Sequence, residues 1–368
     1  MPVSADQEAR LFPLPFAPMT HQALIRQPRS VSRAARVVAW LTVIVTLGLV
    51  GPCPTEALQV TGLRNPQNFL TDGPGDQYFI SNVNGDPDVK DNNGFISKLD
   101  RSGNVVNLHF IQGGDEGVTL HAPKGMAIVN RTLYVADLDA VRAFDVTSGV
   151  PVRTISFDHI HDKKASTGPM LAELASDDNG LLYVTDTEAH TIYRVDTAKQ
   201  HAVSIVTRDP SLAGPRGIAV HPKTGHLIVV SWDRGKILDV TPQGHVVELV
   251  SNSFFSARFH NLDGVAFDGW GNMYVSDFTG GKIWRMRPNN SFDVIAEYLP
   301  APAGIAIDRE KHLILVPYYY ADAAEINGLE SPKKKGSAPK RNLADYGLGW
   351  FKPEKAQPEE AQKEGPAR

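Results

Sequence analysis

Hydrophobic positions from residue 58 onward come in short runs, such as "GIAV", "LYVAD" and "KIWRM", with Gly, Asp, Asn and Pro between them. Runs of this length between turn residues are typical of β-strands joined by tight turns. No stretch of this region has a helical period of useful length. The pattern therefore predicts an all-β chain.

The runs also repeat as larger units, of which "LDGVAFDGWGNMYVSDFTGGKIWRM" is the clearest copy. Six copies begin at Pro66, Pro123, Ala172, Pro215, Leu262 and Pro302. Matching glycines Gly217 and Gly264 are 47 residues apart, and Tyr134 and Tyr183 are 49 apart. Periods of this size signal propellers or solenoids, and four short strands per unit favour the propeller. We predict a six-bladed β-propeller with four-stranded blades.

The ends of the repeat region predict how the ring closes. The sixth unit ends early, at 324–330, and an unassigned strand-like segment, 58–63, precedes the first unit. We expect this N-terminal strand to complete blade six, so the propeller covers 58–330. The remaining residues, 331–368, are charged and rich in Pro, which predicts a disordered C-terminal tail.

The first 57 residues have the pattern of a targeting segment. Several arginines precede the apolar run 37–50, and small residues follow it, which indicates a secretory signal cut after Ala57. Two alternatives stay open: an uncleaved N-terminal anchor through 37–50, and lipidation at Cys53. The run is shorter than the roughly 20 residues of a membrane-spanning helix. The expected location is periplasmic or secreted, with membrane contact only through an uncleaved N-terminal segment.

Charge and cysteine content exclude several kinds of function. Net charge is −4 and the sequence pI is about 6.3, so no electrostatic footprint for nucleic acid is present. The single cysteine excludes an internal disulfide and a Cys/His zinc cluster. We find no nucleophile elbow, Walker loop or Rossmann fingerprint. The partner is therefore expected to be a small molecule or a protein.

The segments "NGFISKLDRSGNVV", "APKGMAI", "LYVADLD" and "NLDGVAFDGWGNMYVSD" resemble the senescence-marker-protein/gluconolactonase-like propellers, with kinship to NHL-repeat propellers. The resemblance covers about residues 60–330. It implies lactone hydrolysis with a divalent cation at the channel mouth, held by a Glu, an Asn and an Asp. Asp263, in a "DG" pair, matches the Asp; Arg216 stands where the family has the Asn, and no acid stands in the blade-one segment "NPQNF".

Aligning the units on their glycines defines one residue from each blade, and we expect these residues to ring the channel mouth. They are Asn68, Lys124, Glu173, Arg216, Asp263 and Ala303. Four of them alternate in charge, and three alternatives stay open. In the first alternative, the four charges neutralise one another. In the second, Lys124 and Arg216 hold a ligand. In the third, Glu173 and Asp263 bind a cation such as Ca²⁺ or Zn²⁺.

A second set of residues follows the second strand of each unit: Asn82, Asp137, Asp186, Ser231, Asp277 and Pro317. Because Asp and Asn side chains accept hydrogen bonds from nearby backbone N–H groups, we expect turn roles for this set. The aromatic residues that come next, Trp232, Phe278 and Tyr318 in the run 317–320, either form a wall beside the ring or pack between blades.

Two local metal candidates remain. The loop 84–95 crowds Asp and Asn oxygens that suit a hard cation, although it lacks the closing Glu of an EF-hand. His159 and His161 form an H-x-H pair. For both we expect an ordinary polar loop.

Two function hypotheses follow. The first is an extracytoplasmic propeller that binds a small ligand or protein partner at the channel face. The second is a metal-dependent hydrolase of lactone-like esters, with Asp263 as ligand and catalytic base, Glu173 as second ligand, and Lys124 or Arg216 as oxyanion stabiliser.

Overall fold

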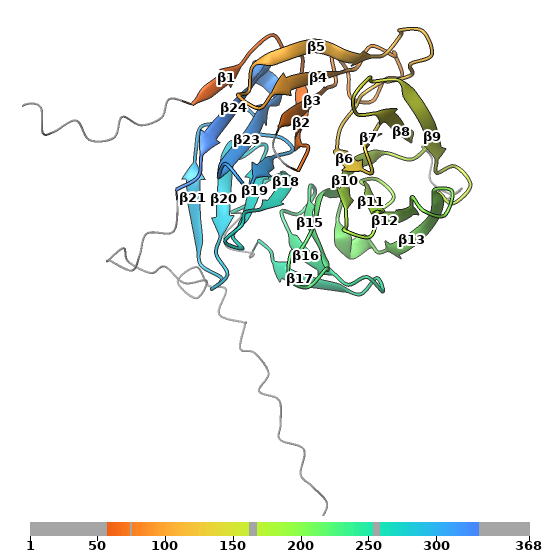
Figure 1. Ribbon diagram of the computed structural model, residues 1–368. Coiled ribbons are helices and arrows are strands. Elements are labelled where there is room, and N and C mark those ends of the chain that lie inside the picture. Colours follow the sequence, from red (N-terminus) through yellow and green to blue (C-terminus); the bar gives the residue numbers. More distant parts are fainter. Residues whose placement is uncertain (1–56, 74–75, 162–167, 253–257, 331–368) are drawn as a thin grey trace, which may run out of the picture. The chain divides into compact units, whose positions relative to one another are not determined.

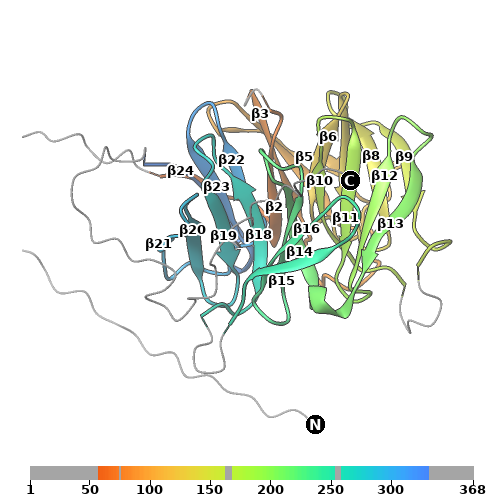
Figure 2. The ribbon, with the colours of Figure 1, turned by 90° about the horizontal axis from the view of Figure 1, so that it is seen from below.

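The computed structural model describes residues 57–73, 76–161, 168–252 and 258–330. These residues form six sheets of four strands each, arranged around a common axis (Figure 1). Figure 2, turned by 90°, shows the blades standing side by side. Neighbouring strands within the blades pair antiparallel. The predicted six-bladed β-propeller is confirmed.

The first three blades run from the innermost to the outermost strand in chain order. Blade one consists of β2 (Pro66–Thr71), β3 (Gln77–Asn82), β4 (Phe95–Asp100) and β5 (Val105–Gln112). Blade two consists of β6 (Met126–Val129), β7 (Thr132–Ala136), β8 (Ala140–Asp145) and β9 (Pro151–Ser156). Blade three consists of β10 (Leu171–Ser176), β11 (Leu181–Asp186), β12 (Thr191–Asp196) and β13 (Ala202–Arg208).

Blades four and five have the same order, and blade six takes one strand from the other end of the propeller. Blade four consists of β14 (Pro215–Val220), β15 (Leu227–Ser231), β16 (Ile237–Val240) and β17 (Val246–Val250). Blade five consists of β18 (Leu262–Phe267), β19 (Met273–Asp277), β20 (Lys282–Met286) and β21 (Phe292–Ala296). Blade six consists of β22 (Ala306–Asp308), β23 (Leu313–Tyr318), β24 (Ala323–Gly328) and β1 (Leu58–Val60).

The strand β1 closes the ring as predicted. It pairs antiparallel with β24, with Leu58 opposite Ile326 and Val60 opposite Ala324. Val60 is buried in the cluster that joins blade six to blade one. The beginning and end of the propeller are therefore joined by backbone hydrogen bonds.

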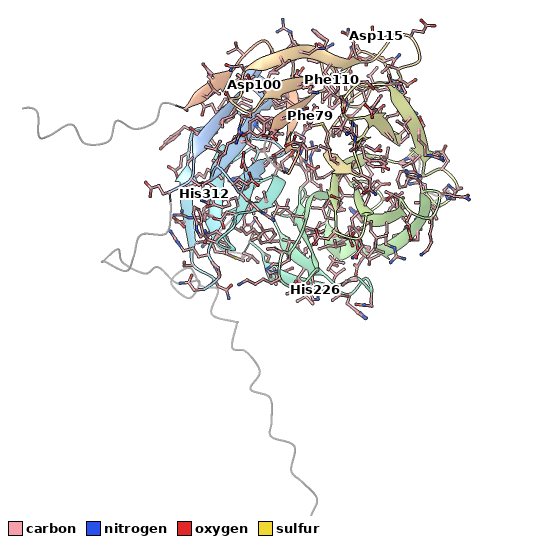
Figure 3. All side chains as sticks on the ribbon, in the orientation of Figure 1. Phe79, Asp100, Phe110, Asp115, His226 and His312 are labelled. Carbon is pink, nitrogen blue, oxygen red and sulfur yellow. The ribbon has the colours of Figure 1, made fainter. Side chains whose placement is uncertain are left out.

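The core lies between the blades. Six apolar clusters each join two neighbouring blades and together they follow the whole ring. Phe79 and Phe110 of blade one, labelled in Figure 3, lie 5.9 Å apart between ring centroids. They belong to the cluster that blade one shares with Met126 and Val135 of blade two. Each blade thus buries both faces against its neighbours, which fits the short, largely apolar strands of the repeat.

Two short 3₁₀ turns, η1 (Pro210–Leu212) and η2 (Tyr319–Ala321), accompany the strands in the described ranges. Among these residues no helix has the length and apolarity needed to cross a membrane. The expected N-terminal segment, apart from Ala57, and the expected tail 331–368 lie outside the described residues.

Candidate ligand site at the channel mouth

The inner strands bring the predicted ring residues to one end of the channel. The ends of the second strands lie at the same end, because Pro215 pairs with Ser231 and Leu262 pairs with Asp277. Four inner strands have a bulge in their pairing at the ring position, namely β2, β10, β14 and β18. A bulge changes the direction of nearby side chains, so neighbouring residues can both face the axis.

Four of the six ring residues are followed by a glycine, which lets the inner strands approach closely. A Cβ atom on Gly217 would lie 2.3 Å from the backbone oxygen of Asp263, and one on Gly264 would lie 2.6 Å from the backbone nitrogen of Ile305. The backbone nitrogen of Gly304 donates to the oxygen of Gln67 at 2.8 Å, which joins blade six to blade one. Below the ring, the channel is therefore narrowed by backbone, and the ring residues form its floor.

Asp263 pairs with Arg216. The Arg216 Nε donates to Asp263 Oδ2 at 2.8 Å, and Gln67 Nε2 donates to Asp263 Oδ1 at 3.0 Å. Asp263 is 2% exposed, whereas the Arg216 side chain is 19% exposed. Burial raises the pKa of Asp263, and the Arg216 charge and the Gln67 hydrogen bond oppose that rise. Both carboxylate oxygens of Asp263 thus have protein partners.

Glu173 has different partners. Asn68 Nδ2 donates to Glu173 Oε2 at 2.7 Å, and the backbone nitrogen of Leu174 donates to Oε1 at 2.9 Å. A Cβ on Gly125 or on Gly304 would meet the Glu173 carboxylate at 2.0 Å and 3.1 Å respectively, so this side chain from blade three reaches both blade two and blade six. Burial raises the pKa of Glu173 to about 8, and the negative charge of Asp263 adds to the rise.

Lys124 does not complete the alternation of charges. Its residue is 4% exposed, and in the described part of the chain no ion pair joins it to Glu173 or to another acid. Burial lowers the pKa of Lys124 to about 8, and the positive charge of Arg216 adds to the lowering. The expected mutual neutralisation therefore holds for the Arg216–Asp263 pair and does not extend to Lys124 and Glu173.

An aromatic wall stands beside the ring. Trp232 contacts Phe278 at 5.3 Å between centroids, Phe278 contacts Tyr319 at 5.7 Å, and Tyr319 contacts Tyr320 at 5.3 Å. The guanidinium carbon of Arg216 lies 4.4 Å from the Trp232 ring centroid. Arg216 thus contacts both the charged floor and the wall.

The wall extends into an apolar cluster from several blades. Besides the aromatic residues it contains Val83, Ala122, Ala301 and Ala303. Burial raises the pKa of Tyr319 to about 12, so its hydroxyl stays protonated at physiological pH. Most of the wall is thus buried, and Trp232 and Tyr320 are its open aromatic residues beside the charged floor.

Tyr318 lies elsewhere. Its hydroxyl donates to Glu325 Oε2 at 2.8 Å, and its ring belongs to the cluster between blades five and six. Tyr319, the next residue, joins the wall instead. Tyr318 is the last residue of β23 and Tyr319 the first of η2, so the end of the strand decides which tyrosine reaches the mouth.

The local turn role predicted for the acids after the second strands holds for Asp186 and Asp277, which accept from backbone nitrogens three residues on, whereas Asp137 accepts from nitrogens 15 and 16 residues earlier. Asp137 accepts from the backbone nitrogens of His121 and Ala122, and Asp277 accepts from those of His260 and Gly280. Asp186 accepts in the same way from Met170 and Ala189. These carboxylates fix the loops that approach the channel.

One His/Asp group within the described ranges has metal-like spacing: His121, Asp137 and Asp139. Its acids already have cationic partners, since Arg142 contacts Asp137 at 3.1 Å and Asp139 at 2.8 Å. Lys90 contacts Asp139 at 2.6 Å. Together with its turn role, this pairing explains the cluster without a metal.

The loop candidates also make local contacts. Asp86 accepts from the backbone nitrogen of Asp88 at 3.0 Å, and Asn93 Nδ2 donates to Asp91 at 2.6 Å. His161 Nδ1 lies 3.3 Å from Asp186 Oδ2. These contacts are those of ordinary polar loops.

The cation predicted at Asp263 and Glu173 must be judged against the partners of both acids. A divalent ion bound by the two carboxylates would displace Arg216 from Asp263 and would meet the positive charge of Lys124. The residues present fit a salt-bridged floor better than a cation site, and the metal stays a prediction.

Gln67 is the ring residue that the repeat alignment misses. Its Nε2 contacts Asp263, and its Oε1 accepts from Arg216 Nη2 at 3.4 Å. It stands one position before Asn68, where regular alternation would turn it away from the channel. The bulge in β2 between Pro66 and Asn68 accounts for its direction, and no sequence signal marks that bulge.

The chain resembles solved six-bladed propellers. Virginiamycin B lyase from Staphylococcus aureus has a TM-score of 0.52 and 14% identity, with 75% of this chain and 99% of that chain covered. A Bacteroides thetaiotaomicron protein of unknown function has a TM-score of 0.56 and 13% identity, with 74% and 71% covered. At these identities the likeness shows the fold alone. No protein-family model and no curated protein matches the chain, so the gluconolactonase-like family stays a prediction.

Proposed function

We propose that the chain is an extracytoplasmic β-propeller that binds a small ligand at the mouth of its central channel. The observation that carries the proposal is Arg216, which contacts the Trp232 ring at 4.4 Å and the Asp263 carboxylate at 2.8 Å. It joins an apolar wall to a polar floor, and a ligand with one flat face and one polar end fits that combination. A protein partner would bind in the same way through a side chain that has a flat face and a polar end. The extracytoplasmic location rests on the pattern of residues 1–57.

A fragment screen by ligand-observed NMR tests this proposal, with Trp232→Ala as the site variant and Trp270→Ala as the matched control. Trp270 stacks on His312 at 4.5 Å and lies in the turn between β18 and β19, at the other end of the blade. Fragments that bind the wild type should lose affinity at least tenfold in Trp232→Ala and keep it in Trp270→Ala. Fragments that bind all three proteins equally would contradict a channel-mouth site.

The second candidate is a metal-dependent hydrolase of lactone-like esters, and the acids at the ring favour it in one respect. Burial raises the pKa of Glu173 to about 8, whereas Asp263 lies against Arg216, so one acid holds a proton near neutral pH beside an ionised neighbour. Pairs of acids with separated pKa values serve acid–base catalysis. In this candidate Asp263 and Glu173 hold a Ca²⁺ or Zn²⁺ ion, and Lys124 or Arg216 stabilises the oxyanion.

Calorimetric titration with Ca²⁺, Zn²⁺ and Mn²⁺ separates the two candidates. The hydrolase requires saturable cation binding and lactone turnover, both lost in Asp263→Ala. A lack of binding, or binding that Asp263→Ala leaves unchanged, removes the hydrolase and leaves the ligand-binding propeller.

A further inference from the structure

Hydrogen bonds fix the backbone of Lys124 at the channel floor. Its backbone nitrogen donates to the oxygen of Ala136 at 2.8 Å, and its backbone oxygen accepts from Ser81 Oγ at 2.7 Å. Blades one and two thus fix its position just before Gly125, the ring position that carries Arg216 and Asp263 in other blades.

Within the described residues, no hydrogen bond or ion pair of the Lys124 ammonium group is found, and its Nζ is not among the buried polar atoms that lack a partner, so this atom keeps contact with solvent although the residue is only 4% exposed. Lysine is almost never buried this deeply unless it is paired. Two of the acids that act on Lys124 are already paired, Asp263 with Arg216 and Gln67, and Asp137 with Arg142. An anionic ligand would supply the partner that the chain itself does not.

Arg216 has donors left for the same ligand. A guanidinium group carries five N–H donors, and the contacts to Asp263 and Gln67 use one each on Nε and Nη2. Its side chain is 19% exposed at the mouth. Lys124 and Arg216 stand directly before Gly125 and Gly217, the corresponding inner positions of blades two and four, with Glu173 of blade three between them in the ring.

The surroundings favour a ligand with a single negative charge. Asp88 and Asp137 act on Lys124 together with Asp263, and Asp86 and Asp88 act on Tyr319 in the wall. These acids would repel a second anionic group. In the wall Phe278 is buried, so the partly buried Trp232 and the exposed Tyr320 are the aromatic residues open to a ligand ring.

We propose that the channel mouth binds a small aromatic monocarboxylate, with its carboxylate between Lys124 and Arg216 and its ring against Trp232 and Tyr320. This inference rests on the proposed function and specifies its ligand. The carboxylate gains charge-assisted hydrogen bonds from two cations, and the ring gains apolar contact with the wall.

Three fluorinated probes of similar shape test it by ¹⁹F NMR titration: 4-fluorobenzoate, the neutral 4-fluorobenzamide and the cationic 4-fluorobenzylamine. The benzoate should bind at least tenfold more tightly than the amide, and the amine should not bind. Lys124→Met should abolish the preference for benzoate, and Lys124→Arg should retain part of it. Since Lys124→Met removes a buried charge, the variant is expected to fold.

Lys98→Met is the matched control. Lys98 lies over the Phe110 ring at 4.7 Å in blade one, and burial lowers its pKa as well, but it is not a ring residue. Its replacement should leave benzoate binding unchanged. In addition, benzoate binding at pH 8.5 should take up a larger fraction of a proton in the wild type than in Lys124→Met, where Glu173 is the remaining ring residue that titrates near this pH, measured by calorimetry in two buffers.

Two outcomes overturn the inference. If the amide binds as tightly as the benzoate and Trp232→Ala weakens both, the channel site stands but its preference for carboxylates is wrong. If no probe binds at millimolar concentration, the ligand class is wrong, and the fragment screen with Trp232→Ala still decides the proposed function.

Discussion

At the residue scale, Asp263 is defined by its contact with Arg216. This acid is the position that matches the metal ligand of the gluconolactonase-like family, and here both of its oxygens accept hydrogen bonds from protein side chains. Because the pair is largely buried, removal of one member leaves the other charge uncompensated.

Asp263→Ala should therefore lower the free energy of unfolding by about 3 kcal/mol. The double variant Arg216→Met/Asp263→Ala should recover part of this loss, because neither charge then remains buried alone. Urea unfolding of both single variants and the double variant measures the coupling. As a control, Asp76→Ala breaks an exposed 3.6 Å pair with Arg101 and should cost less than about 1 kcal/mol. If the losses in unfolding free energy of the two single variants simply add up in the double variant, the pair contributes nothing to stability.

Glu173 gives the ring a pH dependence. In the folded protein its pKa is raised to about 8 from an ordinary value of 4.5. The folded state therefore keeps a proton that the unfolded state releases, and this contribution to stability is lost as pH rises toward 8.

Glu173→Gln should match the wild type in stability near pH 5 and exceed it at pH 9, as measured by urea unfolding across this range. Glu248→Gln is a control of opposite sign, because the Lys236 hydrogen bond lowers the pKa of Glu248. That variant should be the less stable protein at pH 7, with the difference disappearing at low pH. A constant gap between Glu173→Gln and the wild type would mean that the carboxyl is ionised throughout.

At the element scale, the inner strands have two features that regular strands lack: bulges at the ring positions and glycines packed against neighbouring backbone. The bulges turn polar side chains toward the axis, and the glycines allow the strands to approach closely enough for that axis to be narrow.

Gly264→Ala tests the close approach. Its Cβ would lie 2.6 Å from the Ile305 nitrogen and 3.0 Å from the Ala303 oxygen, and backbone cannot move aside as a flexible side chain can. We expect a loss of about 1–3 kcal/mol in unfolding free energy, the usual cost of overpacking. Gly269→Ala, in a turn with nothing within 4 Å of the added atom, should change stability by less than about 0.5 kcal/mol. Equal stabilities would show that the inner strands can separate freely.

At the scale of the whole molecule, the propeller is held closed by β1. Leu58, Gln59 and Val60 pair with the last strand of blade six, and Val60 is 3% exposed. Without this pairing, β24 would be an unprotected sheet edge and blade six would lose a strand.

Val60→Asp should lower the unfolding free energy by about 3 kcal/mol or more, since it places a charge in the cluster between blades six and one. Gln59→Thr changes an exposed neighbour in the same strand and should be close to neutral. Thermal and urea unfolding measure both. A Val60→Asp variant as stable as the wild type would mean that β1 is not needed for closure.

The sequence by itself determined the blades, their strands, the closing strand and five polar ring positions with Ala303. These follow from the two-residue alternation and the repeat period, which encode pairing between segments that are close in the chain. The turn roles of Asp186 and Asp277 could be predicted for the same reason, whereas the contacts of Asp137 with a segment 15 residues earlier could not.

Only the tertiary structure decided which ring residues contact one another. Gln67 and Asp263 are 196 positions apart, and Asn68 and Glu173 are 105 apart. Their contacts depend on the bulges and on the distance between blades, which no local pattern specifies. The same holds for the choice of Tyr319 over Tyr318 in the wall, and for the burial of Lys124 at the channel with no ion pair to any described residue.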